Sequence, residues 1–98
     1  MTVYAVAQFK YTDKDLYDRY VANFAEVFVK YKGTLLINNE NPDVLEGEWG
    51  MDKLVMMSFP SKQDFFDWAS SDEYRDIVKD RLAGSTGVVL LSEQFQFD

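Results

Sequence analysis

Two patterns in this sequence predict an α+β domain of the ferredoxin-like class. Segments that alternate like strands and segments with helical periodicity follow one another in the order β-α-β-β-α-β, which is typical of a four-stranded antiparallel sheet with helices on one face. Three of the predicted strands also carry apolar residues on both sides, so both sheet faces need a cover. The helices cover only one face, and a second copy of the chain is the simplest cover for the other. We therefore expect one domain over residues 1–98 that pairs through its sheet face into a homodimer.

The first strand and the first helix are predicted from a change of period near residue 12. Residues 3–11 alternate as a strand does, with apolar side chains on both sides near the start. Either Thr12 or Asp13 then caps a helix, which apolar residues at helical spacing extend to about Tyr31. We expect Gly33 to end this helix in the left-handed conformation that glycine adopts at helix C-termini.

The middle of the chain supplies the second and third strands. They are predicted at residues 34–38 and 53–59, and Pro60 ends the third strand. Between them lie a loop of composition N-E-N-P-D and a short extended piece at 44–49, which Gly47 interrupts.

The second helical region is predicted in two pieces. The capping sequence S-K-Q-D at 61–64 begins the first piece, and Ser71 or Asp72 caps the second. Gly84 ends the second piece, and after a short turn the last strand is expected at 88–97.

Charge excludes some partners. The chain has 17 acidic and 10 basic residues and a net charge of -7, so nucleic acids and anionic membrane surfaces are poor partners. It shows neither a signal-peptide pattern at its start nor an apolar run long enough to cross a bilayer. We expect a cytoplasmic protein.

The absence of cysteine and histidine excludes several chemistries. With no Cys and no His, the chain offers no disulfide, no thiolate, no Ser-His-Asp triad and no imidazole ligand for zinc or haem. No calcium-loop pattern is present either. We expect no cofactor, and any acid-base chemistry must use Asp, Glu, Tyr, Lys or Arg.

Arg81 is the most informative residue of the last predicted helix. Tyr74, Ile77, Val78 and Leu82 share one face of this helix, and Arg81 falls on that same face. An unpaired buried charge is unfavourable, so Arg81 needs a carboxylate, a polar pocket or a ligand. Two interpretations follow: a cation at the helix edge or in a structural ion pair, or an anion-binding group in a pocket.

Four sequence pieces together resemble a known family. They are L-E-G-E-W at 45–49, F-P-S at 59–61, W-A-S-S-D-E-Y at 68–74, and Arg81 seven residues later. In this order, and over nearly the whole chain, they resemble a small bacterial family of dimeric α+β barrel proteins that carries a domain-of-unknown-function label. The resemblance implies ferredoxin-like protomers that pair into a barrel. The wider superfamily is similar to cofactor-free monooxygenases, muconolactone-type isomerases and haem-dependent proteins, but the family has no established reaction.

The resemblance also implies a set of pocket residues. By matching position, Glu46, Trp49, Tyr74 and Arg81 would surround a pocket. Arg81 could bind a carboxylate or enolate with two hydrogen bonds, or it could pair with Glu46. Glu46 is the best candidate for acid-base chemistry, because an apolar context favours a protonated carboxyl group. The alternative is that Glu46 is an exposed charge at a strand edge.

Other aromatic and polar residues complete the candidate site. Trp49 and Trp68 could stack on a planar ligand or belong to the core, and Tyr20 and Asn38 are further ligand-binding candidates. Two functions remain open. One is a protein that binds a small acidic or aromatic metabolite beside Arg81, either as a binding protein or as a cofactor-independent enzyme. The other is a non-catalytic dimeric module with an Arg81–Glu46 core ion pair. A cavity of roughly 300 Å³ beside Arg81 would favour the first.

Overall fold

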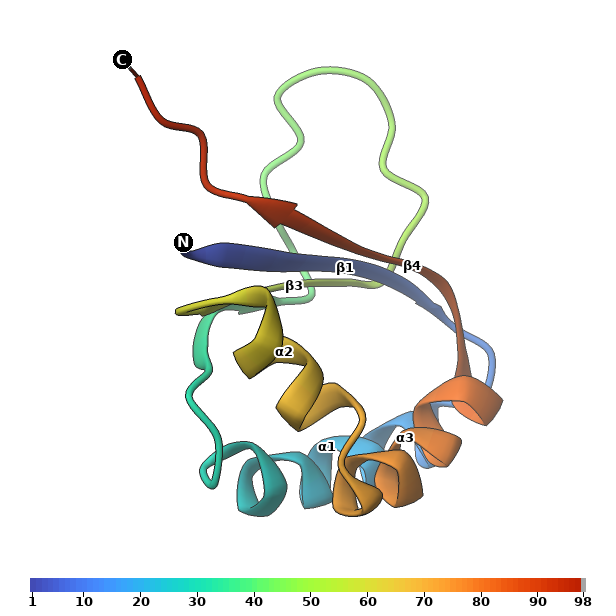
Figure 1. Ribbon diagram of the computed structural model, residues 1–98. Coiled ribbons are helices and arrows are strands. Elements are labelled where there is room, and N and C mark those ends of the chain that lie inside the picture. The colour runs from blue at the N-terminus through green and yellow to red at the C-terminus, as the bar shows by residue number, and fades with distance from the viewer. Residues whose placement is uncertain (98) are drawn as a thin grey trace.

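A computed structural model describes residues 1–97 and has the predicted ferredoxin-like architecture (Figure 1). Four antiparallel strands form one sheet in the order β2-β3-β1-β4, and the helices lie on one side of it. The second helical region consists of two helices, as predicted. In chain order the elements are β1 (Val3–Tyr11), α1 (Lys14–Phe28), β2 (Thr34–Asn39), β3 (Lys53–Phe59), α2 (Lys62–Ala69), α3 (Asp72–Gly84) and β4 (Ser85–Glu93).

Each helix begins at a side-chain cap that the sequence predicted. Asp13, Ser61 and Ser71 are the N-caps of α1, α2 and α3, and each side chain accepts a hydrogen bond from the backbone N–H three residues later. These bonds satisfy N–H groups that would otherwise lack a partner in the first helical turn. The caps therefore fix where the helices start relative to the sheet.

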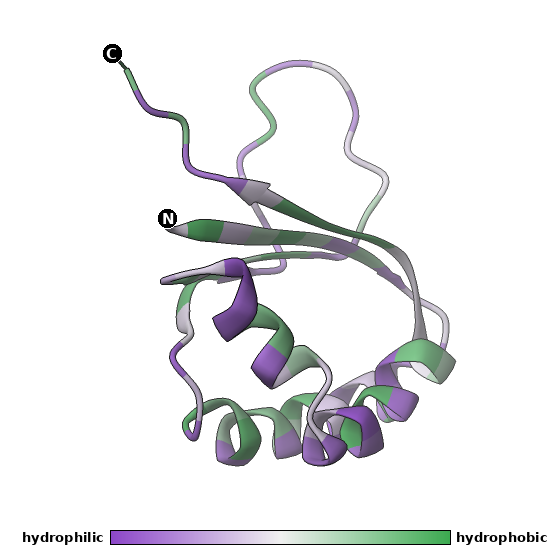
Figure 2. Ribbon diagram, in the orientation of Figure 1, coloured by the Kyte–Doolittle hydropathy of each residue, from purple (hydrophilic) through white to green (hydrophobic). Residues whose placement is uncertain are grey.

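The core lies between the sheet and the helices. Alternate residues of β1 and β3 are buried against the helices, and large aromatic rings meet them from the helical side. Phe59 packs against both Phe28 and Trp68, with ring centroids 5.9 and 5.6 Å away. Figure 2 shows the hydrophobic residues along the strands and helices that bound this layer.

Backbone hydrogen bonds and a close contact at Gly84, which we call the α3–α1 joint, connect the end of α3 to the start of α1. The backbone N–H groups of Thr12 and Asp13 donate to the carbonyl oxygen of Gly84, at 2.9 and 3.1 Å. A Cβ atom at Gly84 would lie only 2.7 Å from the backbone nitrogen of Tyr17. Because only glycine allows this approach, the last turn of α3 lies directly against α1.

The end of the first helix differs from the prediction. α1 ends at Phe28 rather than near Tyr31, and Gly33 does not have the predicted left-handed conformation. Gly33 is instead required by space, since a Cβ there would lie 2.5 Å from a ring atom of Phe28 and 2.7 Å from a ring atom of Phe59. Glycine is needed at position 33, but the reason is side-chain packing and not the backbone conformation.

Residues 44–49, predicted as a short extended piece, belong to a long loop between β2 and β3. The bounds of the last strand were predicted wrongly. β4 begins at Ser85 and ends at Glu93, rather than spanning 88–97. Gly87 lies within this strand with a φ of 154°. Glycine is needed here because a Cβ atom would overlap the carbonyl oxygen of Gln8 on β1. Glycine was taken as a turn signal, whereas here it allows close strand pairing.

The sheet face away from the helices is also apolar. Val6 pairs with Met56 on one side and with Leu90 on the other, so these three side chains share that outer face. Val6 and Met56 are half-buried, whereas Leu90 and Val88 of β4 are exposed. The prediction that β1, β3 and β4 are apolar on both sides is therefore confirmed.

Candidate ligand-binding site

A cavity of about 320 Å³ lies between the sheet and the helices. β1 and β3 form its floor with Ala5, Ala7, Phe9, Val55 and Met57. The three helices contribute most of the remaining walls, chiefly with aromatic and aliphatic side chains, and β2 and β4 add Leu35, Asn38 and Val89. A mostly apolar cavity of this size with few polar groups is typical of a small-molecule site.

Arg81 of α3 brings a positive charge to this cavity. Its Cζ atom lies 4.8 Å from the ring centroid of Phe9 and 5.9 Å from that of Tyr20. Among residues 1–97, no salt bridge or hydrogen bond involves the Arg81 side chain. The rings hold the guanidinium by cation-π contact, while its N–H groups lack a protein acceptor within the described chain.

Tyr20 and Tyr74 contribute a buried pair of hydroxyl groups. Their oxygens are 2.8 Å apart, and both side chains are buried. Burial, reinforced by the Tyr74 hydroxyl, raises the pKa of Tyr20 far above its ordinary value, although Arg81 acts in the opposite direction. Tyr20 therefore keeps its proton and is available as a neutral hydrogen-bonding group.

Tyr17 also lines the cavity, although the candidate set did not include it. Its side chain is 2% exposed. Burial raises the pKa of its hydroxyl to about 12, while nearby Arg81 lowers it. Tyr17 lies three residues before Tyr20 on α1, so their spacing on one helical face was the available signal.

Trp68 and Asn38 are both in the cavity wall. The ring of Trp68 is 4.1 Å from that of Tyr74, between centroids, and 3% exposed. Its Nε1 is buried without a hydrogen-bond partner among the described residues. Asn38 pairs with Val55 across β2 and β3, which places it on the helical side of the sheet.

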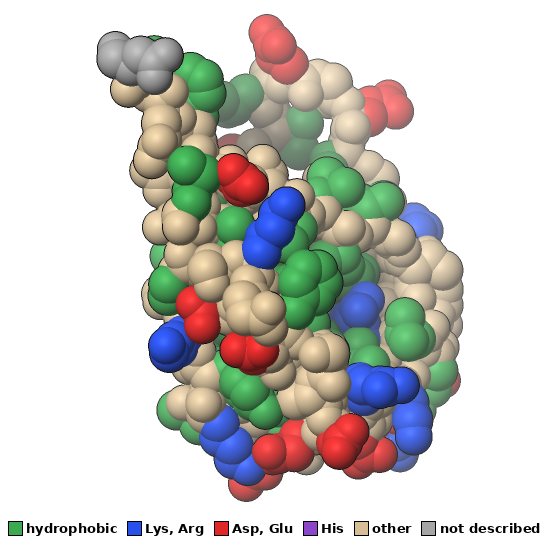
Figure 3. All heavy atoms as spheres, viewed as in Figure 1, with side chains coloured by type: hydrophobic (Ala, Val, Ile, Leu, Met, Phe, Trp, Pro, Cys, Tyr) green, Lys and Arg blue, Asp and Glu red, His purple; other side chains and the backbone are tan. Residues whose placement is uncertain are grey.

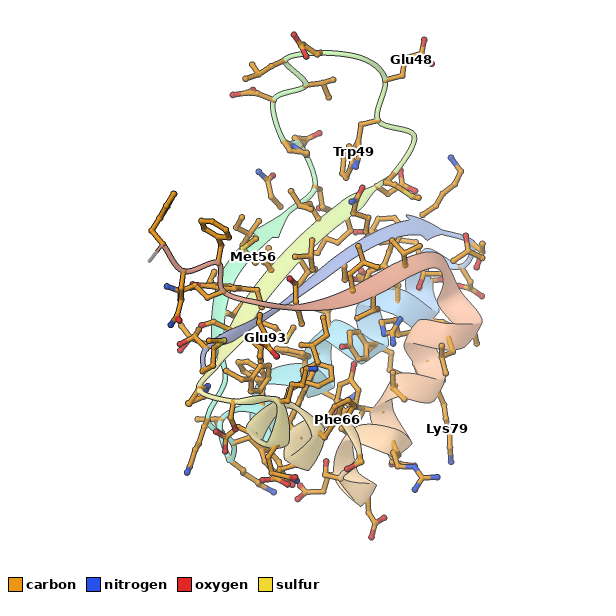
Figure 4. The ribbon with its side chains drawn as sticks, turned by 45° about the horizontal axis from the view of Figure 1, so that its top comes forward. Glu48, Trp49, Met56, Phe66, Lys79 and Glu93 are labelled. Carbon is orange, nitrogen blue, oxygen red and sulfur yellow. The ribbon has the colours of Figure 1, made fainter. Side chains whose placement is uncertain are left out.

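Glu46 and Trp49 do not join this site. Both lie in the loop between β2 and β3, where Glu46 is exposed. Trp49 Nε1 donates to Oε1 of Gln8 at 2.9 Å, and Gln8 belongs to the outer sheet face. Figure 4 shows this loop beyond the sheet, away from the helices. The structure thus brings together Arg81, Tyr74, Tyr20, Trp68 and Asn38, and leaves the other two residues outside.

The proposed Arg81–Glu46 ion pair is also absent from the described part of the chain. This alternative is not supported, because the loop that carries L-E-G-E-W leaves Glu46 exposed. No carboxylate lines the cavity within residues 1–97, so a conventional Asp or Glu base is not in position.

Two other findings bear on the class of site. In the described chain, no group of three or more His, Cys, Asp or Glu residues could hold a metal ion. No helix within residues 1–97 is both long and apolar enough to span a membrane.

The polar groups of the cavity are a guanidinium, tyrosine hydroxyls and an amide, which suit an electron-rich or anionic ligand.

Fold and cavity together define a ferredoxin-like α+β protein with a mostly apolar cavity between its sheet and its helices. The chain belongs to the family described as domain of unknown function DUF1330, which matches residues 2–95. A comparison with curated proteins found no match.

Solved structures share the fold at low sequence identity. A protein of unknown function from Rhodopseudomonas palustris, RPA0582, is similar with a TM-score of 0.82 and 16% identity, over 97% of this chain and 83% of that one. SnoaB, a cofactor-independent oxygenase from Streptomyces nogalater, has a TM-score of 0.67 and 14% identity, over 98% and 95%. An ethyl tert-butyl ether degradation family protein from Bacillus halodurans has a TM-score of 0.61 and 17% identity, over 97% and 100%. At these identities the similarity shows the fold alone.

Proposed function

We propose that this protein binds a small, largely apolar metabolite whose acidic group lies beside Arg81. One observation carries the proposal: a guanidinium reaches an apolar cavity without any carboxylate partner in the described chain. A charge in this position is compensated when a ligand supplies the opposite charge. The planar guanidinium suits a carboxylate or enolate, which accepts two parallel hydrogen bonds.

The aromatic rings of the cavity would contact the apolar part of the ligand. Phe9, Tyr17, Tyr20 and Phe24 line the cavity together with Trp68. Flat rings bury a large apolar area and pack edge or face against an aromatic ligand. The ligand class that satisfies both halves is a small aromatic or aliphatic acid.

Thermal melts against a panel of small carboxylates test this function. A ligand at 100 times its dissociation constant adds about 2.7 kcal/mol to stability, which raises the midpoint of so small a domain by several degrees or more. We expect such a shift in wild type and in Arg75→Met, which changes an exposed residue of the same helix. Arg81→Met should abolish it. Equal shifts in both variants would contradict a role for Arg81.

Cofactor-independent chemistry on the bound metabolite is the second candidate. It is supported by the structural similarity to SnoaB, whose reaction needs no cofactor. A positive charge at the site favours the ionised form of an enol or phenol, and such an ion is the electron-rich species that cofactor-free chemistry requires. Incubating a ligand from the panel with the protein in air and following its mass separates turnover from binding alone.

We also propose that the protein is a homodimer in which two outer sheet faces meet. Val88 and Leu90 expose apolar surface there, at 46% and 58%. The solvent side of the helices is unsuitable because it carries charges of both signs (Figure 3). Arg19, for example, is paired with Asp80 at 2.6 Å. A sheet face is the apolar surface that a second copy would bury.

A further inference from the structure

We propose that the ligand is a flat monocarboxylic acid that carries a second oxygen, a hydroxyl or a keto group. The carboxylate binds Arg81, and the second oxygen binds the Tyr20–Tyr74 hydroxyl pair. This inference rests on the proposed function and specifies its ligand.

The charge of the cavity limits the ligand to one negative charge. Arg81 is the single basic residue that lines the cavity within the described chain. A phosphate carries more charge than one guanidinium balances, and the surrounding walls are apolar. A carboxylate matches the single cation in charge and in planar geometry.

The tyrosine pair has a hydrogen-bonding capacity that the protein leaves unused. Two hydroxyl groups carry two hydrogens, and the bond between Tyr20 and Tyr74 uses one of them. No second hydrogen bond to either hydroxyl is present within residues 1–97. Since both side chains are buried, one O–H group is available to an oxygen that enters the cavity.

Geometry places the two polar groups within reach of one small molecule. Cζ of Arg81 lies 5.9 Å from the ring centroid of Tyr20, whose hydroxyl is bonded to that of Tyr74. Since that hydroxyl is attached to the ring that Arg81 contacts, one small molecule in the cavity can reach both the guanidinium and the hydroxyl pair. A volume of about 320 Å³ also suits a ligand of this size.

The exposure of the residues that line the cavity indicates which end of the ligand lies deeper. Leu82, next to Arg81, lines the cavity and is 65% exposed, and Val89 of β4 lines it and is 48% exposed. Arg81 itself is half-buried, so the charged group lies nearer to solvent than the tyrosine hydroxyls do. Tyr20 and Tyr74 are 6% and 7% exposed, so the uncharged oxygen lies at the deeper end.

Calorimetric titration with two matched probes tests the inference. 4-Hydroxybenzoate has the second oxygen, and 4-methylbenzoate replaces it with a group of similar size. We expect wild type to bind 4-hydroxybenzoate at least about tenfold more tightly. In Tyr20→Phe/Tyr74→Phe, which keeps both rings and removes both hydroxyls, the preference for 4-hydroxybenzoate should disappear or reverse, because its hydroxyl is then buried without a partner. Tyr4→Phe, on the outer sheet face, should keep the preference.

The outcomes separate this inference from the proposed function. Equal affinity of wild type for both probes, or a preference that survives in the double variant, overturns the inference. Failure of both probes to bind, while another carboxylate binds in an Arg81-dependent way, overturns it too and leaves the proposed function standing. Carboxylate binding that is indifferent to Arg81→Met overturns both. The wild-type comparison alone is decisive if the double variant fails to fold.

Discussion

At the scale of single residues, the contacts of Arg81 bear on whether its charge stabilises the fold. Its guanidinium lies over the rings of Phe9 and Tyr20, and such contacts contribute only about 0.5–1 kcal/mol at accessible sites. A structural ion pair would require a carboxylate within reach, and the described chain places none there. The stability of the ligand-free protein should therefore depend little on this charge.

Arg81→Met tests that expectation. Methionine keeps apolar bulk near Phe9 and removes an unbalanced charge, so the free energy of unfolding should change by less than about 1 kcal/mol or should increase. Urea unfolding of the ligand-free variant measures it, with Arg75→Met as control. A loss of about 3–5 kcal/mol, typical of a broken buried ion pair, would mean that Arg81 is structural.

Tyr17 predicts how stability depends on alkaline pH. Burial raises the pKa of its hydroxyl to about 12, whereas in the unfolded chain the group ionises near about 10. Between these values the unfolded chain binds fewer protons than the folded one, so stability falls as pH rises. Urea unfolding from pH 9 to 11 should show a smaller decline in Tyr17→Phe than in wild type. Identical pH slopes would refute this.

At the scale of elements, α3 positions the site. Tyr74 and Arg81 lie seven residues apart, so two helical turns bring them to the same face. Ser71 caps the start of the helix, and its end at Gly84 is bonded to the start of α1. This joint sets the distance between Arg81 and the tyrosines of α1.

Gly84→Ala should disturb that joint. The added Cβ would lie 2.7 Å from Tyr17 N and 2.8 Å from Asp13 O. We expect a loss of about 1–3 kcal/mol in the free energy of unfolding, which exceeds the usual benefit of alanine in a helix. Gly50→Ala is the matched control, because a Cβ there meets nothing within 4 Å, and its effect should stay within about 0.5 kcal/mol. Equal effects of the two would rule out this steric argument.

The elements also show what the sequence could predict. The shared face of Tyr74 and Arg81 follows from helical periodicity, which is local, and in the structure both residues line one cavity. The placement of Glu46 and Trp49 depends on the direction in which a loop leaves the sheet. No local pattern encodes that direction, and the resemblance to a family placed both residues at the pocket. Gly33 and Gly87 were misread because their cause is contact with Phe59 and with Gln8, far away in sequence.

At the scale of the whole molecule, two surfaces have different roles. The inner sheet face meets the helices and encloses the cavity, and the outer face carries Val6, Met56 and Leu90. The loop around Trp49 lies on the outer side, through its bond to Gln8. In the proposed dimer this loop would therefore lie near the partner rather than near the ligand.

Leu90→Lys tests the dimer. Leu90 is 58% exposed on the outer face, where an interface of standard size buries about 800 Å² per partner. Light scattering after gel filtration should show that wild type has twice the protomer mass of 11.4 kDa. The variant should have the mass of a single protomer. Val29→Lys changes an exposed residue at the end of α1 and should leave the dimer intact. A monomeric wild type would contradict the proposal.

A fluorescence titration tests the central claim, that Arg81 binds an acid inside the cavity between the sheet and the helices. The chain has two tryptophans, and Trp49→Phe leaves only Trp68, which lines the cavity. We predict a saturable change of Trp68 emission with small aromatic carboxylates in Trp49→Phe. The change should persist when Arg75→Met is added and vanish when Arg81→Met is added. An unchanged Trp68 signal for carboxylates that bind by calorimetry, or a response that survives Arg81→Met, would contradict the claim.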